Sequence, residues 1–193
     1  MRGYALTPIV LTAGLIAAPL QQPGIAQEKR TIASVLDHQF TAAEQDLVAA
    51  AEAMPEAKYA FVPTNGEFKG VRTFGQQLKH VAVYNNRSFG AMLGQTPAAD
   101  GDNGPDMVRT KEQILKYLKD SFALGHRAIA TIGPGNLLSE VKNSPEAGYD
   151  TPLALVTFAC WHAYDHYGQI VEYLRMNHIV PPASRNSPLA NPR

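Results

Sequence analysis

The segment from Thr151 to Asn177 reads TPLALVTFACWHAYDHYGQIVEYLRMN, and its apolar side chains recur every three or four residues. This period is typical of an α-helix that buries one side. Thr151 is a favourable N-cap, and Pro152 suits the first turn because its missing N–H would have no intrahelical partner there. Pro181 and Pro182 follow the segment, so we predict one long helix that ends near Asn177.

Three earlier segments show the same helical period, over about residues 31–53, 73–94 and 110–133. The second and third begin with a threonine that is followed three residues later by a glutamine, the pattern of a capping box. No segment alternates convincingly between apolar and polar residues, so the predicted fold class is all-α. Each helix carries an apolar stripe that must be buried, and four such helices packed together form a four-helix bundle. The connection over residues 94–109 is long enough to cross over along the bundle.

The two ends of the chain differ from the bundle in composition. Residues 1–26 are predicted to be a signal peptide, because one arginine and an apolar run precede small residues at Gly24 and Ala26. A retained membrane anchor is the alternative, but the run contains two prolines and is shorter than the roughly 20 apolar residues that span a bilayer. The bundle then covers residues 27–182, and residues 183–193 form an extended tail. We expect an exported protein with no stable membrane insertion after cleavage.

The charge balance and the single cysteine exclude several classes of protein. The chain has 17 Lys and Arg residues against 17 Asp and Glu residues, so its formal net charge is zero. Binding nucleic acid through its phosphates needs a basic excess, so we expect no nucleic-acid partner. Cys160 is the only cysteine, which excludes an internal disulfide and sites built from cysteine pairs. We interpret Cys160 as a buried apolar residue, with an accessible thiol as the alternative.

The motif that points to chemistry is His162-Ala163-Tyr164-Asp165-His166, in the middle of the fourth predicted helix. Residues four apart lie about 40° from each other around a helix, with Cβ atoms about 6 Å apart. Both imidazoles fall within the apolar stripe, where polar rings without partners would be costly. A shared metal ion would use both rings, and separate hydrogen bonds in the core are the alternative. Alanine follows His162, so this is not the H-E-x-x-H motif of metalloproteases.

A third ligand must come from another part of the chain, since two histidines make a weak metal site. His38 lies on the polar side of the first predicted helix, and His178 lies at the end of the fourth. His80 flanks the apolar stripe of the second helix, and His126 lies at the edge of the stripe of the third. Helix geometry alone therefore leaves His80 and His126 as equal candidates.

Two segments of the chain resemble the DinB-like (YfiT-like) family of metal-binding helical bundles. They read VRTFGQQLKHVA over residues 71–82 and HAYDHYGQ over residues 162–169, with YLR following at residues 173–175. The resemblance covers about residues 31–182 and implies a four-helix bundle with a crossover connection, often a homodimer. It also implies a divalent metal ion, zinc or nickel, on three histidines. The histidines that match the family's motif are His80, His162 and His166.

The same resemblance implies a function. Three histidines leave a coordination position for water or a substrate, and a divalent ion can hold a thiol deprotonated. Characterised members of the family are similar in carrying out metal-dependent transfer or isomerisation with a low-molecular-weight thiol, so we expect a metal-dependent transferase acting on a small molecule. A non-enzymatic exported metal-binding or stress protein is the alternative, and a metal-free bundle that binds a small apolar ligand is a third hypothesis. Candidate side chains around the ligands, each with a surface role as the alternative, are Tyr84, Asp165 and Gln169.

One acidic turn, Asp100–Asp106, shows some likeness to a calcium-binding loop. Such a loop has glycine at its sixth position and glutamate at its twelfth, where this chain has Pro105 and Lys111. We therefore interpret the segment as a solvated turn.

Overall fold

The computed structural model describes residues 30–96 and 100–185, which form four α-helices and two short 3₁₀ turns. The elements are α1 (Ile32–Ala53), η1 (Glu56–Lys58), α2 (Phe74–Met92), α3 (Lys111–Ile129), α4 (Pro152–Met176) and η2 (Pro182–Ser184). The described residues contain no β-strand. The all-α prediction is confirmed, and each helix lies in one of the four segments with a helical period.

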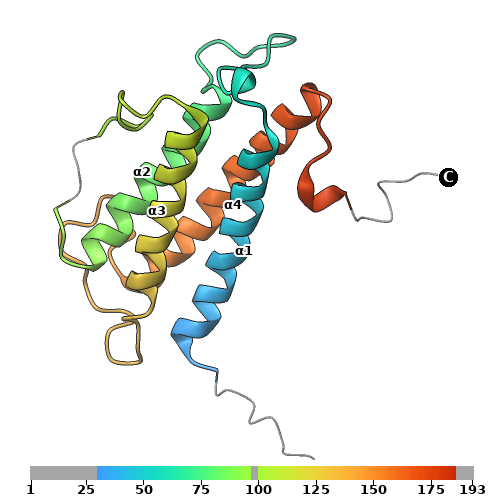
Figure 1. Cartoon of the computed structure of the whole chain (residues 1–193). Helices are drawn as coiled ribbons and strands as arrows, with labels where there is room; N and C mark the ends of the chain where they lie inside the picture. Colours follow the sequence, from blue (N-terminus) through green and yellow to red (C-terminus); the bar gives the residue numbers. More distant parts are fainter. Residues whose placement is uncertain (1–29, 97–99, 186–193) are drawn as a thin grey trace, which may run out of the picture.

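The four helices form a bundle with a crossover connection (Figure 1). Both α1 and α2 pack against α3 and α4, so α1 and α2 lie at opposite corners of the bundle. Helices α2 and α3 run in the same direction, and the connection between them therefore returns along the length of the bundle. The crossover predicted from its length is thus confirmed, and this connection passes beside α2.

Threonine side chains define where the helices begin. In all four cases the threonine hydroxyl oxygen accepts a hydrogen bond from the backbone N–H three residues further on. The N-cap residues are Thr31, Thr73, Thr110 and Thr151. Both predicted threonine–glutamine capping boxes form, since each glutamine side chain also accepts from the backbone N–H of its threonine. The cap at Thr73 fixes the residue at which α2 begins. This helix carries part of the candidate site.

Aromatic rings fill the centre of the bundle. Phe40 of α1 is fully buried, and its ring centroid lies 5.0 Å from that of Phe89 in α2 and 4.9 Å from that of Phe122 in α3. Gly125 of α3 lies directly against Phe40 and Phe89, so the backbone of α3 approaches these rings closely. This packing holds α1, α2 and α3 in a fixed relation to one another.

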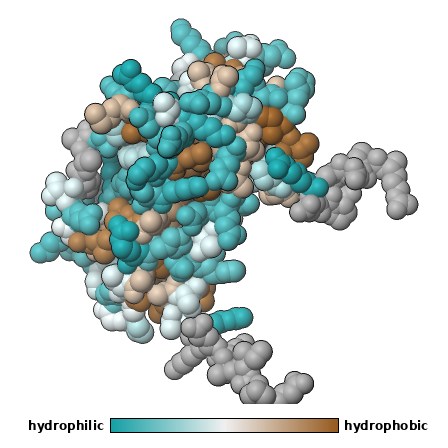
Figure 2. All heavy atoms as spheres, in the orientation of Figure 1, coloured by the Kyte–Doolittle hydropathy of each residue, from teal (hydrophilic) through white to brown (hydrophobic). Residues whose placement is uncertain are grey.

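A shallow groove between α1 and α4 carries exposed apolar side chains. Trp161 and Tyr164 are 50% and 42% exposed, and both line the groove together with Cys160. Burial raises the pKa of the half-buried Cys160 thiol to about 11, so the thiol is protonated at neutral pH. Figure 2 shows the surface in the orientation of Figure 1, where apolar residues form separate patches among hydrophilic residues.

The segments predicted for the two ends of the chain lie mostly outside the described residues. The predicted signal peptide, residues 1–26, lies outside the described residues, as do residues 186–193 of the predicted tail. The part of the tail that is described belongs to η2 and the residue after it. Among the described helices, none combines the length and the apolar character that crossing a membrane requires.

His126 links α3 to α1 through two carboxylates. Its Nδ1 lies 2.6 Å from Asp37 Oδ1, and its Nε2 lies 3.0 Å from Glu44 Oε2. Burial lowers the pKa of His126, but the hydrogen bonds to the two carboxylates outweigh burial and raise the pKa above its ordinary value. Because both ring nitrogens donate only when the imidazole is protonated, the bridge is complete in the cationic form.

Replacing His126 by glutamine is expected to lower the free energy of unfolding by about 1 kcal/mol at pH 6, and by less at pH 9. The raised pKa means that protonation stabilises the fold below the ordinary histidine pKa of about 6.5. This contribution is lost as the pH rises through the folded-state pKa. Urea unfolding of both proteins at the two pH values measures the difference, and an equal loss at both would contradict the bridge.

Candidate metal centre

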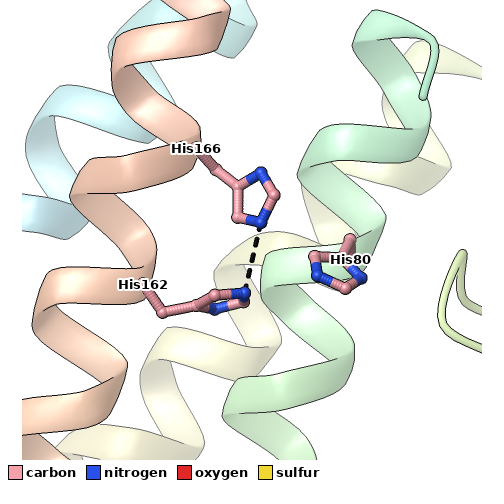
Figure 3. A group of neighbouring side chains, drawn as sticks. All are labelled: His80, His162 and His166. Carbon is pink, nitrogen blue, oxygen red and sulfur yellow. Dashed lines mark hydrogen bonds between the residues drawn. The ribbon is translucent and has the colours of Figure 1, made fainter. Parts of the chain in front are cut away.

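Three histidine rings meet between α2 and α4 (Figure 3). His80 comes from α2, whereas His162 and His166 come from successive turns of α4. The centroid of the His80 ring lies 5.1 Å from that of His162 and 4.8 Å from that of His166, and the latter two are 4.7 Å apart. Each ring offers a nitrogen, and these nitrogens all lie within 4.8 Å of one another. The structure thus brings together the three residues that match the family's motif.

All three rings are buried, and burial decides their charge. The exposed fractions of His80, His162 and His166 are 6%, 7% and 5%. Burial is the main cause that lowers all three pKa values, to about 3 for His162 and about 4 for His166. The rings are therefore neutral at pH 7, and a neutral imidazole has the free lone pair that a metal ion requires.

Hydrogen bonds fix the orientation of two of the rings. His80 Nδ1 lies 2.7 Å from the backbone carbonyl oxygen of Asp102, and His166 Nδ1 meets the side-chain oxygen Oε1 of Gln77. A carbonyl oxygen only accepts, so in both neutral rings Nδ1 carries the hydrogen and Nε2 carries the lone pair. Partners of this kind commonly orient histidines that bind metal ions.

A divalent ion fits between these nitrogens. The Nε2 atoms of His162 and His166 lie 3.2 Å apart. Two nitrogens bound to one zinc ion at about 2.0–2.1 Å, with an angle of roughly 90–109° between them, are about 2.8–3.4 Å from each other. Among the described residues, Nδ1 of His162 is buried without a hydrogen-bond partner, so no competing contact turns Nε2 away from the other rings. Three neutral imidazoles can therefore hold a metal ion, and this donor set suits zinc and nickel.

A series of hydrogen-bonded side chains links the triad to the surface of α4. Gln77 is 2% exposed, and it donates from Nε2 to Gln169 Oε1 at 2.8 Å while its own Oε1 accepts from His166. Gln169 in turn donates to Asp165 at 3.1 Å. Gln169 and Asp165, two of the candidate side chains, are exposed, and their hydrogen bonds reach the triad through Gln77. Gln77 was not among the candidate side chains, although it lies one helical turn before His80 and on the same side of α2.

The acidic turn between α2 and α3 is part of the site. We interpreted Asp100–Asp106 as a solvated turn, but the backbone of Asp102 contacts the buried ring of His80. Arg87 holds the turn against α2 by donating to the Asp100 carbonyl and pairing with the Asp102 carboxylate at 3.2 Å. The turn reaches the triad through one backbone carbonyl, that of Asp102.

Aromatic side chains form one wall of the site. The ring of Tyr84, the third candidate side chain, lies 4.6 Å from that of His80 and 4.9 Å from that of His162. Phe158, one turn before His162, stacks on its ring at 5.2 Å with an angle of 11° between the planes. Burial raises the pKa of Tyr84, so its hydroxyl is protonated at neutral pH. The wall is apolar except for this hydroxyl.

The other histidines lie apart from the triad. His126 is engaged by the two carboxylates between α3 and α1, so the structure resolves the choice between His80 and His126 in favour of His80. His38 is exposed on α1, as expected. His178 follows α4 with a φ of 60°, the left-handed conformation that commonly ends a helix.

Replacing Gln77 by leucine is expected to weaken zinc binding about 10–100-fold, because His166 would lose the acceptor that fixes its lone pair on Nε2. Calorimetric titration of the metal-free protein with zinc measures the change. Gln45→Leu, an exposed glutamine on α1, is the matched control and should bind zinc as the unchanged protein does. Equal affinities for Gln77→Leu and Gln45→Leu would show that Gln77 does not orient the ring.

The fold and the buried histidines define this protein as a four-helix bundle with a three-histidine centre that can hold a metal ion. A family model described as the DinB superfamily matches residues 39–170, and the chain belongs to that superfamily. The match spans the triad and confirms the resemblance noted from the sequence.

The chain is similar to a protein whose crystal structure is described as that of "the conserved protein of locus from Enterococcus faecalis". The two share 16% sequence identity with a TM-score of 0.57, and the match covers 77% of this chain and 98% of the other. At this identity the likeness concerns the fold alone. A comparison with curated proteins finds no match.

Proposed function

We propose that the protein is an exported, metal-dependent transferase that activates a low-molecular-weight thiol at a divalent ion held by His80, His162 and His166. Zinc or nickel is the proposed ion, since neutral imidazoles suit both. The observation that carries the proposal is the convergence of three buried, neutral rings whose nitrogens lie within 4.8 Å of one another.

The number of ligands supports a reactive centre. A closed structural zinc site has four protein ligands, whereas a catalytic site has three and keeps a position for a substrate. The cluster within the described part of the chain contains three histidines and no cysteine or carboxylate. When bound there, a divalent ion would supply a Lewis acid that favours the thiolate form of a thiol.

The chain's own residues prepare the site for this chemistry. Gln77 and the Asp102 carbonyl hold two rings by their Nδ1 hydrogens, so that Nε2 of each ring stays available at neutral pH. Phe158 and Tyr84 pack against the rings and exclude water from one side. The Tyr84 hydroxyl is protonated and can donate a hydrogen bond to a negatively charged group at the centre.

Thiol-transfer kinetics test the proposal. Protein loaded with zinc or with nickel is mixed with an aryl halide electrophile and with glutathione, cysteine or 2-mercaptoethanol in turn, and thioether formation is followed by absorbance. We expect acceleration with at least one thiol, and loss of that acceleration in His162→Ala. A protein that binds metal but accelerates none of these reactions would contradict the transferase and favour the alternative, a non-enzymatic exported metal-binding protein.

Export forms a separate part of the proposal. It is supported by the arginine, the apolar run and the small residues that precede the predicted cleavage after Ala26. Mass spectrometry of the protein secreted or released from the producing cell tests it, since a mature chain beginning at Gln27 is expected. A mature chain that retains residues 1–26 would contradict cleavage.

A further inference from the structure

Arg72 lies beside the histidine triad, although no part of the proposed function uses it. It directly precedes Thr73, the N-cap of α2. Its Nε donates to Asn103 Oδ1 at 2.9 Å, and Asn103 is the neighbour of Asp102, whose carbonyl accepts from His80. The guanidinium and the His80 ring therefore contact adjacent residues of the same turn.

The position of Arg72 is also fixed from the side of α4. Its backbone carbonyl accepts a hydrogen bond from the hydroxyl of Tyr173 at 3.1 Å, and Tyr173 lies two turns after His166. Arg72 thus sits where the beginning of α2 approaches the later part of α4. In keeping with this placement, its positive charge adds to burial in lowering the pKa of His166, His162 and His80.

Most N–H donors of the Arg72 guanidinium have no hydrogen-bond partner among the described residues. Among the described residues, it forms no ion pair, and its only side-chain hydrogen bond uses Nε. Arginine carries five N–H donors in a planar fork that matches a carboxylate. The other cations near the triad are occupied, because Arg87 pairs with Asp102 and Lys79 donates to the Pro105 carbonyl at 2.7 Å.

The positive charge of the metal-loaded site favours an anionic ligand. Three neutral imidazoles compensate neither of the two positive charges of a divalent ion, and Arg72 adds a third positive charge. The Asp165 carboxylate also acts on His162, but it is exposed, so solvent screens its negative charge. Where a site excludes part of the solvent, unpaired charges of one sign favour ligands of the opposite sign more strongly than in bulk water. A thiolate would supply one negative charge, and a second negative group would fit the free edge of the guanidinium.

We propose that Arg72 is a specificity-determining residue that binds a carboxylate of the thiol ligand at the triad, so that the site prefers thiols bearing a carboxylate over neutral thiols. This inference rests on the proposed function and names the chemical class of its thiol. Arg72 contacts the ligand's carboxylate and takes no part in bond making or breaking.

Binding to cobalt-loaded protein tests the inference without any measurement of activity. 3-Mercaptopropionate and 3-mercaptopropan-1-ol have the same length and differ in the carboxylate, and the sulfur-to-cobalt absorption band reports binding of each. We expect the acid to bind at least about tenfold more tightly than the alcohol. In Arg72→Gln the two thiols should bind equally, with the affinity for the alcohol unchanged within about twofold. Arg72→Lys should keep part of the preference, since it retains the charge without the fork.

Two further variants separate ligand binding from structural support. Asn103→Ala removes the hydrogen bond between Arg72 and the turn but keeps the guanidinium, so the preference for the acid should persist. Arg127→Gln, an exposed arginine on α3, is the control for loss of charge and should behave like the unchanged protein. If the acid and the alcohol bind equally, or if Arg72→Gln keeps the preference, the inference is overturned while the proposed function stands. If neither thiol binds the cobalt-loaded protein, the proposed function is overturned and the inference falls with it.

Discussion

Replacing His162 by alanine is expected to abolish stoichiometric metal binding, with the affinity for zinc falling by more than about 100-fold. His162 is one of the two histidines that α4 contributes to the triad: its Nε2 lies 3.2 Å from Nε2 of His166, and its ring lies 5.1 Å from that of His80. Without it, the two remaining rings come from different helices and make a weak site. Calorimetric titration with zinc, together with metal analysis of the dialysed protein, measures the loss.

The fold of this variant must be shown to persist. Circular dichroism should report nearly unchanged helical content, because the ring is replaced by a good helix former within α4. His162→Gln, which keeps more of the side-chain volume, gives a second variant in which metal binding is lost for the same reason. His38→Ala changes an exposed histidine and should bind one zinc ion per chain. Retained binding in both His162 variants would show that the ligands were wrongly assigned.

Replacing Gly125 by alanine is expected to lower the free energy of unfolding by about 3 kcal/mol, at the upper end of the range for overpacked cores. A Cβ atom at this position would lie 2.6 Å from Phe40 Cζ and 2.8 Å from Phe89 Cε2. Both rings are fully buried and cannot move aside without displacing their neighbours. The clash therefore outweighs the gain of about 1 kcal/mol that alanine usually brings to a helix interior.

Thermal unfolding measures this effect, and the melting temperature should fall by roughly 10 °C. Gly168→Ala is the matched control, because Gly168 lies on the exposed side of α4 with no atom within 4 Å of the added Cβ. That variant should be more stable by about 0.5–1 kcal/mol. If Gly125→Ala is as stable as Gly168→Ala, α3 does not pack against the rings of α1 and α2 as described.

The features that depend on local sequence were predictable. The helical period and the threonine caps gave the four helices, because both signals act within one or two turns. The pairing of His162 with His166 was equally local, since a four-residue spacing places both rings on one side of whichever helix contains them. The family resemblance then supplied His80.

The features that depend on packing between helices were not predictable from spacing. His80 and His126 both lie beside an apolar stripe, and only the rotation of α2 and α3 within the bundle decides which ring faces α4. Gln77 could have been found, because it lies one turn before His80 on the same side of α2. The Asp102 carbonyl could not, because every residue has a backbone carbonyl and no side chain marks the one that meets the ring.

A crystal structure of the zinc-loaded protein, with anomalous diffraction recorded at the zinc absorption edge, tests the central claim most directly. We expect one strong anomalous peak between α2 and α4, about 2.0–2.1 Å from a nitrogen of each of His80, His162 and His166. A peak beside His126, or no peak in contact with these three rings, would contradict the account.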